Sequence, residues 1–98
     1  MREDALRPSS YLGYDHDTLG IYFLEREAFA LAEAQFRRAA WLNPYELMFP
    51  IHQAQALLRL GLPDRARLLL HQVLVAHPDN DAARRLWRRH WPDEPMCP

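Results

Sequence analysis

The sequence predicts an all-α protein of about five helices, arranged as antiparallel helical hairpins that stack side by side. Three observations support this. Apolar residues recur at helical spacing, prolines and a glycine divide the chain into helix-sized segments, and the pattern repeats after 34 residues, the separation of Pro44 and Pro78. At 98 residues, of which 49% are hydrophobic, the chain suffices for one small folded domain.

The 34-residue offset relates residues of similar size along the chain. The pairs are Gly20 with Ala54, Phe23 with Leu57, Ala32 with Ala66, Phe36 with Leu70, and Ala39 with Val73. Helices that cross closely need small residues at the crossing and large apolar residues beside it. We therefore interpret these positions as core and not as a cofactor site.

This spacing resembles the tetratricopeptide repeat (TPR) family, with its pattern W-x2-L-G-x2-Y, A-x3-F and P. The first unit supplies Leu19, Gly20, Phe23, Ala32, Phe36 and Pro44, with His16 in place of the usual Trp. The second is looser and supplies Ala54, Leu57, Ala66, Leu70 and Pro78, with Pro50 and Gln53 departing from the pattern. The resemblance implies a short right-handed superhelix of two repeats with a C-terminal capping helix.

The repeat frame divides the chain into five parts. They are an N-terminal arm (1–12), a first repeat (13–46), a second repeat (47–80), a capping helix (81–91) and a Pro-rich tail (92–98). We expect both ends to be flexible, because neither has a helical apolar pattern.

Capping residues, prolines and a glycine predict where each helix begins and ends. We expect helices over about 15–26, 28–42, 45 or 47 to 60, 63–76 and from about 80 to 90. Pro50 is tolerable only in a first turn, where its missing N–H has no helical partner. Gly61 should form a left-handed cap, and the run Asp79-Asn80-Asp81 offers an N-cap for the last helix.

The first and last helices carry specific burial predictions. The first should bury Leu19, Phe23 and either Ile21 or Tyr22. The last should turn Leu86, Trp87 and either His90 or Trp91 inward, and present Arg84, Arg85, Arg88 and Arg89 largely outward. An outward polar face is what the terminal helix of a repeat array requires.

Charge and cysteine content bear on partners and location. The formal net charge is −1, so no general field attracts nucleic acid or an anionic membrane. The one cysteine, Cys97, allows no intrachain disulfide and suits a reducing compartment. The first seven residues lack the apolar run of a signal peptide, and no stretch reaches 18 apolar residues. We expect a cytoplasmic protein without a membrane segment.

Nothing in the sequence predicts an enzyme, a cofactor or a metal site. The five histidines (His16, His52, His71, His77 and His90) are dispersed, and no Gly-rich phosphate loop or paired-Cys zinc motif is present. The arginines of 84–89 near Trp91 are the one feature that suggests nucleic acid, and such a cluster is more often a solvated helix face. We therefore do not expect nucleic acid as a partner.

The TPR resemblance implies a concave groove along the first helices of the repeats, where a peptide or a partner helix binds. Carried over by register, its residues are Tyr14, Asp17, Ile21 and Leu24 in the first unit, Met48, Ile51, His52, Gln55 and Arg59 in the second, and Arg85 and Arg89 beyond. The polar set that TPR proteins use to clamp acidic chaperone tails is not present at the matching positions. A non-enzymatic protein-binding adaptor is the leading prediction.

Two alternatives remain open. Two repeats fall below the usual minimum of three, and Trp41, Leu68-Leu69-Leu70, Val73, Leu74 and Val75 exceed one core stripe, so the convex side is a candidate homodimer interface. The segment 49–54 with Leu57 and Leu58 also resembles class II type III secretion chaperones, which hold translocator proteins. Ile21, Leu24 and Ile51 could instead pack against each other, against the N-terminal arm or against a second subunit.

Overall fold

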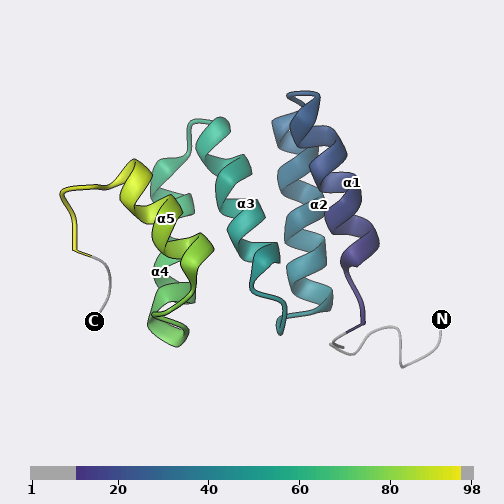
Figure 1. The fold of residues 1–98 in the computed structure, drawn as a ribbon. Helices are drawn as coiled ribbons and strands as arrows, with labels where there is room; N and C mark the ends of the chain where they lie inside the picture. The colour runs from purple at the N-terminus through teal and green to yellow at the C-terminus, as the bar shows by residue number, and fades with distance from the viewer. Residues whose placement is uncertain (1–10, 96–98) are drawn as a thin grey trace.

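The computed structural model describes residues 11–95, and within this range it contains five α-helices and no strand. They are α1 (Tyr14–Glu25), α2 (Phe29–Leu42), α3 (Met48–Arg59), α4 (Pro63–Ala76) and α5 (Asp81–His90). Each of the first four packs against the next, and α5 packs against α4 and α3. Along the row, α1 lies at one end and α5 at the other (Figure 1). The predicted all-α fold of about five helices is confirmed.

The second hairpin repeats the first at an offset of 34 residues. The bounds of α3 and α4 lie 34 positions after those of α1 and α2. The turns inside the two hairpins also match, because Ala28 N–H donates to the carbonyl of Phe23 and Leu62 N–H to that of Leu57, both at 2.9 Å. Each bond closes a six-residue turn of the kind that ends helices with a left-handed residue. That residue is Gly61 in the second hairpin, as predicted, and Glu27 in the first.

The helix starts follow from local chemistry. α3 begins at Met48, whose N–H donates to Oε2 of Glu46 at 3.2 Å, so Pro50 falls in the first turn as predicted. α4 begins at Pro63. At α5 the side chain of Asn80 accepts a hydrogen bond from the Ala83 N–H at 3.0 Å, which confirms the predicted N-cap.

The core lies at the paired positions that the repeat identified. Every member of the five pairs is buried except Phe23, which is half-buried. The first residue of each pair lies in α1 or α2, and the second lies at the equivalent position of α3 or α4. These buried residues help to hold each hairpin together. Their prediction as core is confirmed, with Phe23 only partly enclosed.

The prediction for the first helix was wrong in part. Leu19, Ile21 and Tyr22 are 41%, 37% and 47% exposed, and Gly20 is the one fully buried residue of α1. α1 is the end of the row and packs mainly on α2, so no helix of the described residues covers its outward side. Sequence periodicity identifies an apolar face but not whether a neighbour exists to cover it.

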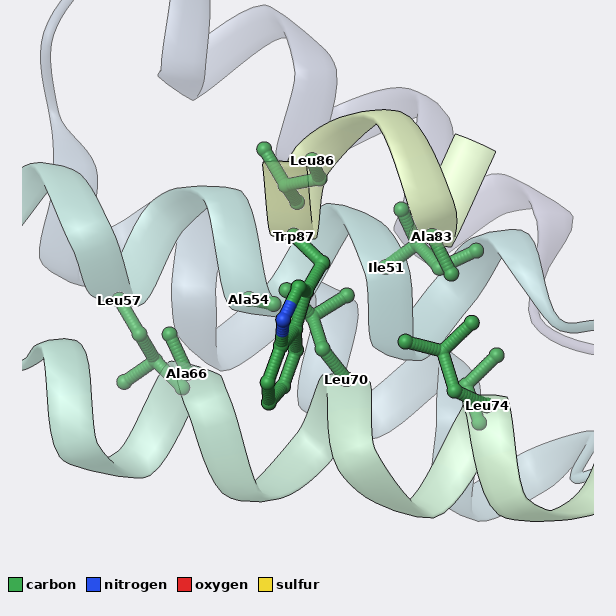
Figure 2. Packing of buried hydrophobic residues seen from close by; sticks show 10 residues of the cluster. Ile51, Ala54, Leu57, Ala66, Leu70, Leu74, Ala83, Leu86 and Trp87 are labelled. Atoms are coloured by element: carbon green, nitrogen blue, oxygen red, sulfur yellow. The ribbon is translucent and has the colours of Figure 1, made fainter. Parts of the chain in front are cut away.

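At the opposite end, α5 closes the core. Trp87 is 2% exposed, and its side chain extends from α5 between α3 and α4 toward Leu70 (Figure 2). Its indole N–H donates to the carbonyl of Glu94 at 3.2 Å. Trp91 is half-buried, with its ring centroid 5.2 Å from that of Trp87, whereas His90 is exposed. Of the two alternatives for the last inward position, Trp91 is correct.

The predicted flexible ends lie largely outside the described residues, which exclude 1–10 and 96–98. The described part of the tail contacts the helices. Glu94 accepts the Trp87 bond through its backbone and forms an ion pair with Arg67 of α4 through its side chain. The chain therefore stays against α4 and α5 for several residues after the last helix.

The buried indole gives a direct test of the closing helix. Replacing Trp87 by Ala removes the largest side chain of this core and should lower the free energy of unfolding by about 3 to 5 kcal/mol. Tyr45→Ala is the matched control, because Tyr45 is 69% exposed and the loss of its ring should cost less than about 1 kcal/mol. Chemical denaturation measures both, and equal midpoints for the two variants would refute the placement of Trp87.

Gly20 and Phe36 give a second test. A Cβ on Gly20 would lie 2.6 Å from Cδ1 of Phe36, whereas the equivalent pair in the second hairpin, Ala54 and Leu70, accommodates a Cβ. Gly20→Ala should therefore destabilise the protein by about 1 to 3 kcal/mol. Phe36→Leu in the same chain should recover part of the loss, because it recreates the second hairpin's pair. Additive losses in a double-mutant cycle would contradict this account.

Candidate functional site

A groove of about 700 Å³ lies between α3 and α5. Its lining residues are Met48, Ile51, Gln55, Ala82, Arg85, Leu86, Arg88 and Arg89. Ile51 and Leu86, only 1% and 7% exposed, form an apolar floor. One rim is formed by the α5 arginines Arg85, Arg88 and Arg89. On the opposite rim, Gln55 of α3 provides a side-chain amide.

The helical period explains why these side chains meet. Met48, Ile51 and Gln55 follow one another at steps of three and four residues, and Ala82, Leu86 and Arg89 do the same on α5. Side chains at such steps share one face of a helix. Trp87 is next to Leu86 and fixes the rotation of α5 by entering the core, so the face that carries Leu86 turns toward α3 (Figure 2).

A second hollow of about 260 Å³ continues the groove. Its lining residues are Leu24, Gln55, Leu58, Arg59, Leu86, Arg89 and His90. Gln55, Leu86 and Arg89 belong to both hollows, so the two are continuous. Leu24 comes from the C-terminal part of α1, and the groove therefore reaches from α5 across α3 to the first helix.

The structure brings together seven of the eleven residues that the TPR register assigned to a groove. They are Leu24, Met48, Ile51, Gln55, Arg59, Arg85 and Arg89. Ile51 contributes only to the floor, because its side chain is part of the core cluster. The other four residues, Tyr14, Asp17, Ile21 and His52, line neither hollow.

Three of those four have contacts of their own. The Tyr14 hydroxyl donates to Oε1 of Glu46 at 2.9 Å, and this hydrogen bond raises the pKa of the phenol above its ordinary value. Nδ1 of His52 lies 2.7 Å from Oδ1 of Asp17, with both side chains largely enclosed. These contacts join α1 to α3 and to the segment before it. Their polar groups therefore support the stack, while Ile21 remains an exposed apolar residue.

The charges at the groove are predominantly basic. Within residues 11–95, no carboxylate pairs with Arg85, Arg88 or Arg89, and all three side chains belong to exposed residues. Arg59 differs, because it lies 4.0 Å from a carboxylate oxygen of Glu27 and 4.5 Å from the ring centre of Phe29. The α5 rim thus presents guanidinium groups that have no intramolecular partner in the described part of the chain.

The TPR register missed several lining residues. They are Leu58, Ala82, Leu86, Arg88 and His90. Leu86 was assigned to the core, and it is both nearly buried and part of the groove floor. The three- and four-residue steps from Ala82 to Leu86 and Arg89 could have identified Ala82 and Leu86, whereas Arg88 depends on how α5 is rotated against α3.

The described residues hold no group of three His, Cys, Asp or Glu side chains arranged to bind a metal ion. His16 instead lies 2.8 Å from the side-chain oxygen of Gln35, and His52 is occupied by Asp17. Between residues 11 and 95, none of the helices combines the length and the apolar character of a membrane span.

Comparison with protein-family models, with curated proteins and with solved structures gives no match to this chain.

Proposed function

We propose that this protein is a non-enzymatic interaction module of the TPR type, which binds a peptide or helix of another protein in the groove between α3 and α5. The observation that carries the proposal is the groove itself, with its apolar floor of Ile51 and Leu86 and its polar rim. Peptide-binding grooves combine apolar contact area with a few polar groups that fix orientation.

The repetition of the hairpin supports the TPR assignment. The 34-residue offset holds for helix bounds, for the turns after Phe23 and Leu57, and for the buried pairs. Stacked hairpins leave one side of their first helices open, and α3 and α5 occupy that role here. The proposal includes a reducing, cytoplasmic location, because a single cysteine leaves the fold without an intrachain disulfide.

The segment that resembles secretion chaperones adds little to this proposal. Phe49, Ile51, Ala54 and Leu57 are buried at 1% exposure or less. Core packing therefore accounts for most of the matching residues, and they support the helical hairpin more than a particular cargo.

The groove can be blocked without disturbing the core. Ile51→Glu is unsuitable because it would bury a carboxylate, whereas Gln55 is only half-buried and lines both hollows. Gln55→Trp should fill the groove and reduce partner capture from an extract of the native cell by about tenfold or more. Thr18→Trp, at an exposed position of α1 that lines neither hollow, is the matched control and should capture normally.

Quantitative mass spectrometry of the captured proteins provides the measurement. Binding of one protein that Gln55→Trp loses and Thr18→Trp retains supports the groove. Equal capture by both variants would show that the groove is not the binding site.

Self-association is a second candidate function, favoured by one observation. Leu31 and Trp41 on α2 and Leu68 and Val75 on α4 are 55% to 58% exposed. The structure buries Leu70, Val73 and Leu74 of the apolar run on α4 and leaves Leu68 and Val75 in solvent. These residues come from the second helix of each hairpin, and a contiguous apolar patch on that side would be typical of an interface between identical subunits.

This candidate predicts a homodimer that depends on Trp41. Light scattering after size-exclusion chromatography should give twice the chain mass at high concentration, and Trp41→Glu should return it to the monomer. Leu19→Glu is the control, because Leu19 is exposed on α1 and outside this surface. A monomeric mass for the unmodified protein at high concentration would eliminate the homodimer.

A further inference from the structure

We propose that the α3/α5 groove selects an acidic amphipathic peptide, in which apolar side chains reach the floor and Asp or Glu side chains pair with the arginines of α5. The inference rests on the proposed function, because it names the chemistry of the partner that the groove would bind. It follows from three independent properties of the rim and the floor.

The first property is the lack of partners for the rim arginines. Elsewhere in the described chain, Arg37 pairs with Glu33 at 3.4 Å, and Arg67 pairs with Glu94. Arg85, Arg88 and Arg89 form no such pair within residues 11–95, although they are gathered at one groove. A bound carboxylate would supply the forked hydrogen bonds that guanidinium groups make best.

The second property is like-charge crowding on α5. Arg84 and Arg88, and likewise Arg85 and Arg89, are four residues apart on a helix whose one acidic residue is Asp81. Like charges at this spacing repel one another and destabilise a helix. The negative end of the helix dipole favours Arg88 and Arg89 in the last turn, and Asp81 stands four residues before Arg85 without forming an ion pair with it in the described residues. Arg85 lies outside that turn, so the dipole does not account for the whole rim.

The third property is the floor, which favours protein over nucleic acid. The apolar residues that line the two hollows are aliphatic. Ile51 and Leu86 are 1% and 7% exposed, so half-buried Met48 and Leu58 offer more of the accessible apolar surface. His90 is the one ring-bearing residue that lines either hollow. Single-stranded nucleic acid is usually held by aromatic rings on which its bases stack. Trp87 lies within the arginine run and is buried in the core, and the ring of Trp91, two residues after Arg89, packs against it. Aliphatic anchors beside carboxylates are the complementary partner chemistry.

The site should therefore be selective and sensitive to salt. Exposed ion pairs at a rim mainly steer association, and their effect falls as ionic strength rises. The apolar floor should retain part of the affinity in high salt. An acidic peptide without apolar residues should bind poorly for the same reason.

A peptide library tests this selectivity. A phage-displayed library of random peptides of about 12 residues is selected on the immobilised full chain, and the most enriched peptide is synthesised with a fluorescent label. We expect enrichment of Asp and Glu together with Leu, Ile or Phe. By fluorescence anisotropy at about 50 mM salt, Arg88→Glu should weaken binding about tenfold.

Arg65→Glu is the matched control. Arg65 is an exposed arginine on α4 that lines neither hollow and has no ion pair in the described residues, so its reversal should change affinity less than about twofold. The difference in peptide affinity between Arg88→Glu and Arg65→Glu should become smaller at about 500 mM salt. Circular dichroism confirms that both remain helical, and Arg88→Gln should give an intermediate affinity.

The outcomes separate this inference from the proposed function. Selected peptides that Gln55→Trp rejects, but that lack acidic residues and ignore Arg88→Glu, overturn the acidic preference and leave the groove as a peptide site. No enrichment, or binding that Gln55→Trp retains, overturns both. A further outcome is that a labelled single-stranded oligothymidylate binds more tightly than the selected peptide and loses its binding in Arg88→Glu. That result would assign the α5 arginines to nucleic acid and overturn the acidic peptide.

Discussion

Trp87 occupies the junction on which the C-terminal half of this protein depends. Its indole lies between α3 and α4 and is almost fully buried, and burial of such a side chain contributes roughly 1.5 to 3 kcal/mol. α5 has only ten residues, too few to be stable as an isolated helix. Its helical form and its position therefore depend on packing against α3 and α4, to which Trp87 contributes together with Ala83 and Leu86. Without α5, one wall of the groove would be missing, and Leu86 would lose the position from which it forms the floor.

The two ends of the helical row have opposite character. At the C-terminal end, α5 covers the core with Leu86 and Trp87 and turns arginines outward. At the N-terminal end, α1 leaves Leu19 and Tyr22 exposed. Each hairpin of a repeat array is stabilised by its neighbours, so a terminal helix without a polar outer face retains uncovered apolar surface. The C-terminal end of the row therefore contains the candidate binding groove, and α1 at the N-terminal end contributes only Leu24 to it.

The polar contacts between helices explain why part of the predicted groove is unavailable. Asp17 pairs with His52, and Tyr14 pairs with Glu46, so these groups satisfy each other between α1 and the second unit. Gln53 likewise donates to Glu33 at 2.8 Å in a buried pair between α3 and α2. Buried polar groups without partners are costly, so the enclosed pairs of His52 with Asp17 and of Gln53 with Glu33 stabilise the stack, whereas the bond of Tyr14 to Glu46 is exposed. The polar side chains of Gln55 on α3 and of Arg85, Arg88 and Arg89 on α5 line the candidate groove.

The sequence by itself determined the repeat, the helix limits near Pro63 and Asn80, and the core pairs, because these depend on local propensity and on spacing along one helix. It also placed seven of the groove residues through the TPR register. Only the tertiary structure decided that Leu19 and Tyr22 of α1 stay exposed, that Asp17 and His52 satisfy each other, and that Ile51 is core. It also brought Arg88 and Leu86 into the groove. These outcomes depend on which helix lies beside which and at what rotation, and neighbour identity is set by the packing of the whole chain.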